Sequence, residues 1–143
     1  SVNVLRVCTT FERGLCALAA IEDGGDRPAL MLIAALCANE LLADHPSYAE
    51  PLGRHLLACS YALKGERQQA IEQLDLAISG LSDCDMGYLA NCARARRGAL
   101  TADQAGRELV QASSEQLRRQ GVVNVERCLN MTTPGFARQR EAI

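Results

Sequence analysis

Residues 57–77 read LACSYALKGERQQAIEQLDLA, and the pattern in this stretch decides the fold. Its apolar residues recur at intervals of three and four, which is the spacing of one face of an α-helix. Gly65 interrupts the pattern near its middle, where a glycine suits the residue that follows a helix. We therefore expect one helix that ends at about residue 64 and a second that covers residues 67–81.

Small residues within this stretch set how closely the two helices approach. Ala58 and Ala70 fall where the helices are expected to cross, so their backbones can lie close together. Tyr61 and Leu74 are large enough to fill the space beside that crossing. The short connection between the helices makes them antiparallel neighbours.

Helix signals extend over the rest of the chain, and strand-like alternation does not persist beyond residues 122–125. The predicted helices cover residues 2–22, 28–44, from between 47 and 51 to 64, 67–81, from 83 or 85 to 97, 102–120 and 124–131. The sequence thus predicts an all-α fold of antiparallel helical hairpins with short turns.

The expected helix ends rest on residues that satisfy free backbone groups. Ser47 with Glu50 and Thr101 with Gln104 fit capping boxes. The other signals are Asp83 or Asp85 and Asn124 as N-terminal caps, with Gly65, Gly98 and Gly121 as helix stops.

With Pro51 as its first position, the central hairpin resembles a tetratricopeptide repeat. The matching residues are Leu57, Ala58, Tyr61, Ala70, Leu74 and Ala77. A divergent copy lies 35 residues later, where Ala105, Leu109 and Ala112 repeat Ala70, Leu74 and Ala77 and where Arg96 replaces Tyr61. The resemblance implies a short solenoid of stacked hairpins. We expect one domain over residues 1–136 and a polar tail over residues 137–143.

A second resemblance concerns the C-terminal half. It is similar to the C-terminal repeat regions of large bacterial multidomain signalling proteins. In those proteins a Ser/Thr kinase or a signalling ATPase precedes the repeats. The similar segments are residues 85–100, 105–106, 120–127 and 133–136. The Pro-Gly-Phe sequence at 134–136 is its most specific element. No kinase motif occurs in this chain, so the resemblance implies a regulatory or partner-binding region.

Composition and motifs argue against several classes of function. A net charge of −2 and a pI near 5.7 do not suit a nucleic-acid-binding protein. No nucleotide-binding, metal-binding or hydrolase motif occurs. His55 and Cys59 lie one helical turn apart and have the residue types of a base and a nucleophile, but this spacing is common on helices. We therefore expect that this protein is not an enzyme and that it has no catalytic residue, no bound metal and no cofactor.

The cysteines and the apolar residues bear on where in the cell the protein is expected to lie. There are seven cysteines, an odd number, and no two of them form a CxxC pair. Free cysteines of this kind behave as small apolar residues and are typical of a reducing compartment, so we expect a cytoplasmic protein. Residues 29–38 are apolar throughout, but ten residues are too few for a bilayer that needs about 20. No membrane association is expected.

The tetratricopeptide resemblance implies a concave groove that binds a partner. The first-helix positions that line it correspond to an apolar strip, Leu52, His55, Cys59, Ala62 and Leu63, and to a basic end, Arg94 and Arg97. Such a groove would take a helix or an extended peptide that carries apolar anchors and an acidic residue. Alternatively, Arg94 and Arg97 are ordinary surface charges that lie over Leu100.

Three functions follow as alternatives. The chain is expected to be a scaffold or partner-binding module of a signalling protein. It could instead assemble with itself as a homodimer through the apolar helix at residues 29–38. It could also be a secretion chaperone of the tetratricopeptide type, which would bind an amphipathic segment of another protein.

Overall fold

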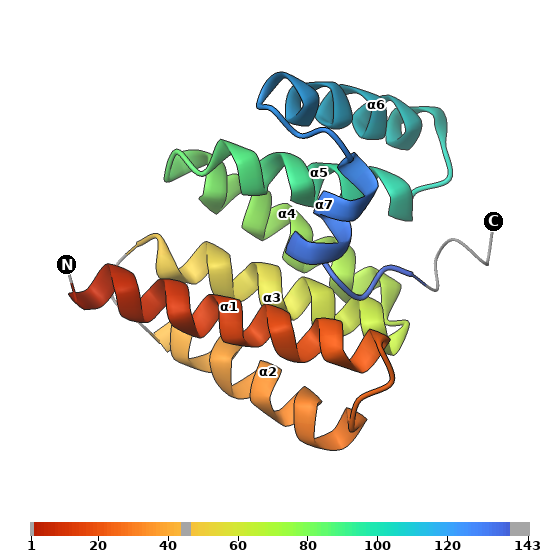
Figure 1. Cartoon of the computed structure of the whole chain (residues 1–143). Helices are drawn as coiled ribbons and strands as arrows, with labels where there is room; N and C mark the ends of the chain where they lie inside the picture. The colour runs from red at the N-terminus through yellow and green to blue at the C-terminus, as the bar shows by residue number, and fades with distance from the viewer. Residues whose placement is uncertain (1, 44–46, 138–143) are drawn as a thin grey trace.

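A computed structural model describes residues 2–43 and 47–137, and these residues form seven helices without a strand (Figure 1). The helices are α1 (Val2–Glu22), α2 (Arg27–Ala43), α3 (Ala49–Lys64), α4 (Arg67–Asp83), α5 (Gly87–Leu100), α6 (Gln104–Arg119) and α7 (Val125–Thr132). The predicted all-α class is confirmed. The predicted end of the second helix at residue 44 and the tail residues 138–143 lie outside the described residues.

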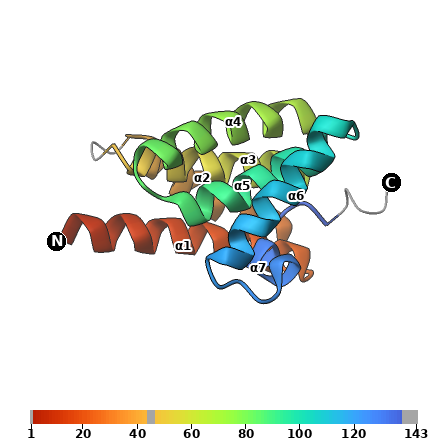
Figure 2. The ribbon, with the colours of Figure 1, turned by 90° about the horizontal axis from the view of Figure 1, so that it is seen from above.

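The first six helices alternate in direction and stack side by side as three hairpins (Figure 1). Their closest packing is between α1 and α2, α3 and α4, and α5 and α6, with α2 also against α3 and α4 against α5. The short helix α7 breaks this order. It lies across α5 and reaches α1 (Figure 1), and the view from above shows it beside the C-terminal end of α1 (Figure 2).

The core follows the pattern of the central stretch. Ala58, Ala70, Leu74 and Ala77 are all fully buried, as the spacing predicted. They belong to one apolar core that extends from Val7 on α1 to Phe136 after α7. A smaller cluster joins α5, α6 and α7 through Cys92, Ala95, Leu117, Cys128 and Leu129.

Two of the predicted helix ends are confirmed in detail. Gly65 has φ 78° and ψ 13°, the left-handed conformation that favours glycine, and ends α3. Asn124 begins α7, since its side-chain oxygen accepts the N–H of Arg127 at 3.0 Å. Gly121, with φ 96°, lies directly after the last turn of α6.

Three predicted N-terminal caps are wrong. Helix α3 begins after Tyr48, which is already in a helical conformation and packs against the core, so Ser47 is not its cap. Helix α5 begins after Met86, because the acidic residues before it belong to the end of α4 and its turn. Helix α6 begins after Asp103, whose carboxylate accepts the N–H of Gly106 at 2.8 Å, and not after Thr101.

The stop that we expected at Gly98 is also wrong, because α5 continues to Leu100. Gly98 serves packing instead. A Cβ atom there would lie 2.5 Å from the carbonyl oxygen of Gly106, so the two glycines allow α5 and α6 to touch through their backbones.

This longer helix changes the register of the second hairpin. Ala105 and Ala112, which were expected to repeat the buried Ala70 and Ala77, are exposed. The buried residues of α6 are Gly106, Ser113 and Leu117, which lie 36 residues after Ala70, Ala77 and Leu81. The buried residues of α6 are therefore offset from those of α4 by one residue more than the 35 residues that the sequence predicted.

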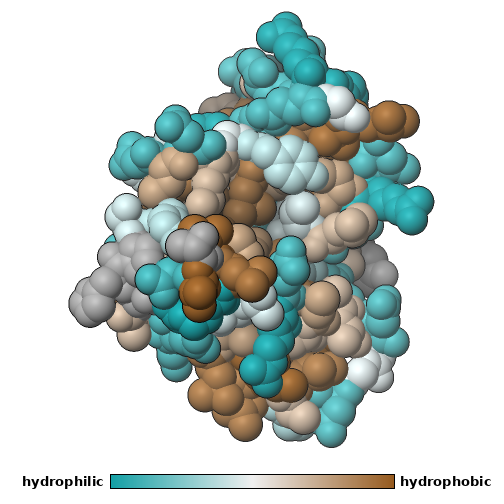
Figure 3. All heavy atoms as spheres, turned by 60° about the vertical axis from the view of Figure 1, so that its left-hand side comes forward, coloured by the Kyte–Doolittle hydropathy of each residue, from teal (hydrophilic) through white to brown (hydrophobic). Residues whose placement is uncertain are grey.

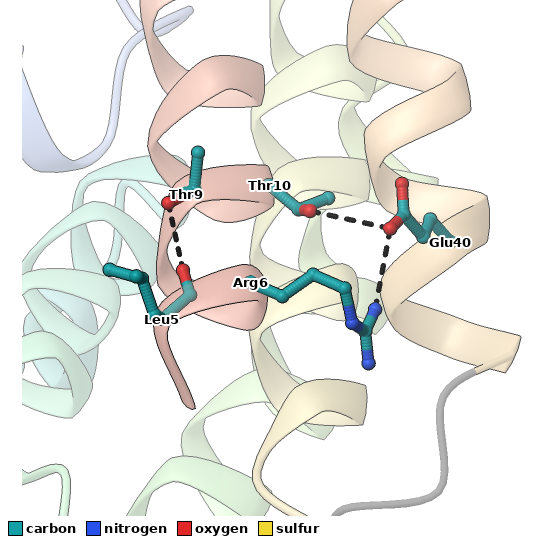
Figure 4. Close-up of polar contacts among 5 residues, drawn as sticks. All are labelled: Leu5, Arg6, Thr9, Thr10 and Glu40. Carbon is teal, nitrogen blue, oxygen red and sulfur yellow. Dashed lines mark hydrogen bonds and ion pairs between the residues drawn. The ribbon is translucent and has the colours of Figure 1, made fainter. Parts of the chain in front are cut away.

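Polar contacts join the first two helices near the start of the chain. The carboxylate of Glu40 on α2 lies 3.3 Å from the guanidinium of Arg6 on α1 and accepts a hydrogen bond from the hydroxyl of Thr10 at 3.5 Å (Figure 4). Thr9 turns back to its own helix and donates to the carbonyl of Leu5 (Figure 4).

No helix in the described part of the chain is both long and apolar enough to cross a membrane.

Candidate functional site

The strip of α3 that was predicted to form the floor of an open groove is buried. Leu52, His55, Cys59, Ala62 and Leu63 are each at most 6% exposed. Helix α1 covers one side of the strip. Residues 132–136, which we call the C-terminal strap, also contact the strip, with Thr132 at His55 and Gly135 at Cys59. The prediction that these five residues line an open groove is therefore wrong, because the chain fills that space with its own segments.

His55 is the first anchor of the strap. Its Nε2 lies 2.7 Å from the carbonyl oxygen of Thr132, and because a carbonyl only accepts, Nε2 carries the proton. The ring of Phe11 on α1 meets the imidazole edge-on, with 5.6 Å between ring centres. Nδ1 is buried and has no hydrogen-bond partner among the described residues. Burial lowers the pKa of His55 to about 4, although the hydrogen bond to Thr132 opposes this shift. The imidazole is therefore a neutral donor.

Arg96 on α5 is the second anchor, and it is only 6% exposed. Its Nε donates to the carbonyl oxygen of Thr133 at 3.2 Å, and a terminal nitrogen donates to the side-chain oxygen of Asn130 at 3.1 Å. The guanidinium carbon lies 5.2 Å from the centre of the Phe136 ring, within the range of a cation–π contact. Arg96 thus holds both the backbone and the aromatic side chain of the strap.

Gly135 is the third point of attachment. Its N–H donates to the carboxylate of Glu22 at the end of α1. It has φ 102°, and a Cβ atom there would lie 2.5 Å from the carbonyl oxygen of Cys59. A side chain at this position would therefore both strain the backbone and push the strap away from α3. The neighbouring Pro134 is fully buried.

The predicted basic end lies elsewhere. Arg94 and Arg97 border a hollow of about 390 Å³ between α4, α5 and α6, and none of the five α3 residues lines it. Arg97 pairs with Asp75 at 2.8 Å, and Arg94 donates to Asn91 and Ser82. The structure therefore does not join the two halves of the predicted site, and the acidic side chain of Asp75 offsets the basic character of this hollow.

Cys59 does not have the chemistry of a nucleophile. Burial raises the pKa of its thiol to about 12, while burial lowers that of His55 to about 4. A thiolate–imidazolium pair would need the opposite shifts. The described residues also contain no group of three His, Cys, Asp or Glu side chains placed to hold a metal ion.

No protein-family model, curated protein or solved structure matches this chain. The features of this chain that bear on function are therefore the geometry of the strap and the surfaces of the helices.

The residues that hold the strap, chiefly Arg96 and Glu22, were not predicted from the sequence. One signal was present, since Arg96 stands where an aromatic core residue was expected. A buried arginine requires partners for its donors, and the Pro-Gly-Phe sequence was already the most specific element of the C-terminal half.

Proposed function

We propose that this protein is a protein–protein interaction module of the tetratricopeptide type whose inner groove binds a short extended segment. One observation supports it most. The helices hold residues 132–136 through two backbone carbonyls, one backbone N–H and one aromatic ring. Main-chain hydrogen bonds combined with a side-chain anchor are typical of peptide recognition.

The partner is then a protein segment with the chemistry of the strap, a Pro-Gly-aromatic sequence that takes its place. The C-terminal strap is the occupant of the groove when no partner is bound. A hollow of about 160 Å³ lies beside Gly135, between Glu22, Arg27 and Leu63, and gives a competing segment a point of entry. We further propose a role in bacterial signalling and a cytoplasmic location. The support for the location is that all seven cysteines are free thiols.

The test is binding of the strap in trans. A fluorescent peptide with the sequence of residues 128–137 is titrated into the wild-type protein and into the Gly135→Ala variant, whose new methyl group we expect to displace the protein's own strap. We expect the variant to bind the peptide roughly tenfold or more tightly, because its groove is free. A peptide that itself carries alanine at position 135 is the matched control and should not bind.

Anisotropy that stays unchanged with the variant, while hydrogen exchange shows its own strap released, would overturn the proposal. The strap would then be a structural part of the core only. Adding Arg96→Ala to the Gly135→Ala variant should abolish binding of the peptide, since the ring and the Thr133 carbonyl lose their common anchor.

A second candidate function is self-assembly, and a specific observation favours it. Leu32 and Leu36 lie one turn apart on α2 and are 61% and 58% exposed. Apolar side chains gather over α2 and beside the N-terminal end of α1 on the same face (Figure 3). Sedimentation across a wide range of concentration should show a dimer that Leu36→Glu dissociates and that Leu76→Glu, at a 51% exposed leucine of α4, leaves intact. A monomer at every concentration would exclude this candidate.

A further inference from the structure

Two cysteines face each other where α7 crosses α5. The Sγ atoms of Cys92 and Cys128 are 3.9 Å apart, and the residues are 0% and 9% exposed. Both are free thiols. The sulfur atoms of a disulfide are about 2.05 Å apart, so a small side-chain rotation would bring these two into bonding distance.

The surroundings give the two thiols different roles. The hydroxyl of Tyr88 lies 2.9 Å from Sγ of Cys128. This contact and burial raise the pKa of Tyr88, so the phenol keeps its proton and can donate it to a sulfur anion. Burial raises the pKa of the Cys92 thiol to about 12, so Cys92 stays protonated until it reacts.

Only one of the two thiols faces a route from solvent. A mainly apolar hollow of about 310 Å³ opens beside Cys128, lined by Tyr88, Val122, Val123 and Met131 among others. Val123 and Met131 are 98% and 66% exposed, so the hollow is accessible at its rim. A small uncharged oxidant can enter it.

We propose that Cys92 and Cys128 form a peroxide-sensitive thiol pair whose disulfide ties α7 to α5 and locks the C-terminal strap in the groove. The effect of the disulfide on the strap, which we call the lock, rests on the proposed function, whereas the formation of the disulfide does not. The strap begins at Thr132, one helical turn after Cys128, so fixing α7 holds the strap at its start.

The oxidant is hydrogen peroxide, and the reaction balances in two steps. The Cys128 thiol releases its proton, its sulfur attacks one peroxide oxygen, and the O–O bond breaks. The departing hydroxide takes up the proton that the thiol released, which gives water and a sulfenic acid. The sulfur of Cys92 then attacks the sulfur of Cys128 and the S–O bond breaks. The proton of Cys92 leaves with the hydroxide as a second water. Two thiols have been oxidised and one peroxide has been reduced.

The experiment starts from a full chain in which the more accessible Cys8, Cys16 and Cys84 are replaced by serine. After treatment with hydrogen peroxide, digestion without reductant should yield the peptide of Cys92 linked to that of Cys128. The melting temperature should rise by about 10 °C and return after reduction. Neither change should occur in Cys92→Ala or Cys128→Ala. Tyr88→Phe should slow the oxidation roughly tenfold, since the anion loses its donor.

Three results of the peroxide treatment would overturn the proposed thiol pair. In the first, both cysteines stay reduced. In the second, Cys128 becomes a sulfinic acid and no disulfide to Cys92 forms, and in the third, the disulfide forms as fast in Tyr88→Phe as in the protein with Tyr88.

The lock has its own readout. In the Gly135→Ala variant, oxidation should reduce binding of the peptide of residues 128–137 at least tenfold. If the disulfide forms and the affinity does not change, the lock is wrong and the peptide groove stands. If the reduced variant binds no peptide, the proposed function fails, and the disulfide is judged by the mass and melting data alone.

Discussion

The hairpins α3–α4 and α5–α6 share one helical pattern but differ where that pattern meets the rest of the chain. In the first, the half-buried Tyr61 takes the aromatic position, with the ammonium of Lys64 5.6 Å from its ring centre. In the second, the same position is Arg96, which is buried and holds the C-terminal strap. One hairpin supplies an apolar surface, and the other supplies the polar groups that fasten a segment to it.

The largest expected difference between the hairpins concerns Arg96 and its neighbour Arg97. Arg96→Ala should lower the free energy of unfolding by about 3 kcal/mol, because it leaves the carbonyl of Thr133 and the side chain of Asn130 without their buried donor. Arg97→Ala, which removes a half-exposed ion pair with Asp75, should cost under about 1 kcal/mol. Urea denaturation measures both. Equal losses would contradict the assignment of Arg96 as the anchor.

The two anchors of the strap should also respond differently to pH. The pKa of His55 is about 4 in the folded protein against an ordinary value of 6.5. Between these values the unfolded chain binds the proton and the folded chain does not, so acid favours unfolding. The contribution of His55 is complete above about pH 6.5 and is lost as the pH falls toward 4, by about 3 kcal/mol.

This pH dependence has a matched variant. His55→Gln keeps a donor for the carbonyl of Thr132 but does not titrate. Its stability should fall less between pH 6.5 and 4 than that of the wild type, measured by denaturation at each pH. The same slope in both proteins would show that other groups control the acid sensitivity.

Close approach of the backbones distinguishes the second hairpin as well. The first hairpin has Leu63 where the second has Gly98, and Ala70 where the second has Gly106. Gly98→Ala should cost about 2 kcal/mol, because its new methyl group would meet the carbonyl of Gly106. Gly87→Ala on the same helix, whose nearest neighbour would be 3.9 Å away, should change stability by under about 0.5 kcal/mol. Thermal unfolding compares them, and similar losses would disprove the close approach.

The smallest effect concerns how the second helix of each hairpin begins. Asp103→Ala should cost about 1 kcal/mol, since its carboxylate accepts the N–H of Gly106 at the start of α6. Glu66→Ala should be close to neutral, because the Glu66 side chain makes no capping hydrogen bond at the start of α4. Helix content and denaturation midpoints test this pair, and a larger loss for Glu66→Ala would contradict it.

Most helix spans followed from the sequence, but several helix ends did not. Gly65 and Asn124 could be predicted because each acts through its own neighbours, by a left-handed conformation or by a side-chain cap. Ser47 and Thr101 have equally good local signals. They failed because the core draws Tyr48 into α3 and because Gly98 continues α5 beyond the expected stop.

The candidate site was likewise predicted only in part from the sequence. The tetratricopeptide resemblance identified the apolar strip of α3 but predicted it to be the open floor of a partner-binding groove, whereas it is buried. What covers it was not predicted, since residues 132–136 reach it only after α7 has turned back across α5. Arg94 and Arg97 were also expected to line that groove, and the structure does not place them there. They face the hollow between α4, α5 and α6, whereas Arg96 contacts the strap.

The sequence by itself determined the helical class, the spans of the hairpins and the buried alanines of the central pair, because all of these depend on spacing along one helix. Only the tertiary structure decided that Arg96, His55 and Glu22 meet one segment and that Cys92 lies 3.9 Å from Cys128. The physical reason is sequence distance. A residue's own helix sets its direction, but the partner it meets is set by the packing of elements that are up to 113 residues apart.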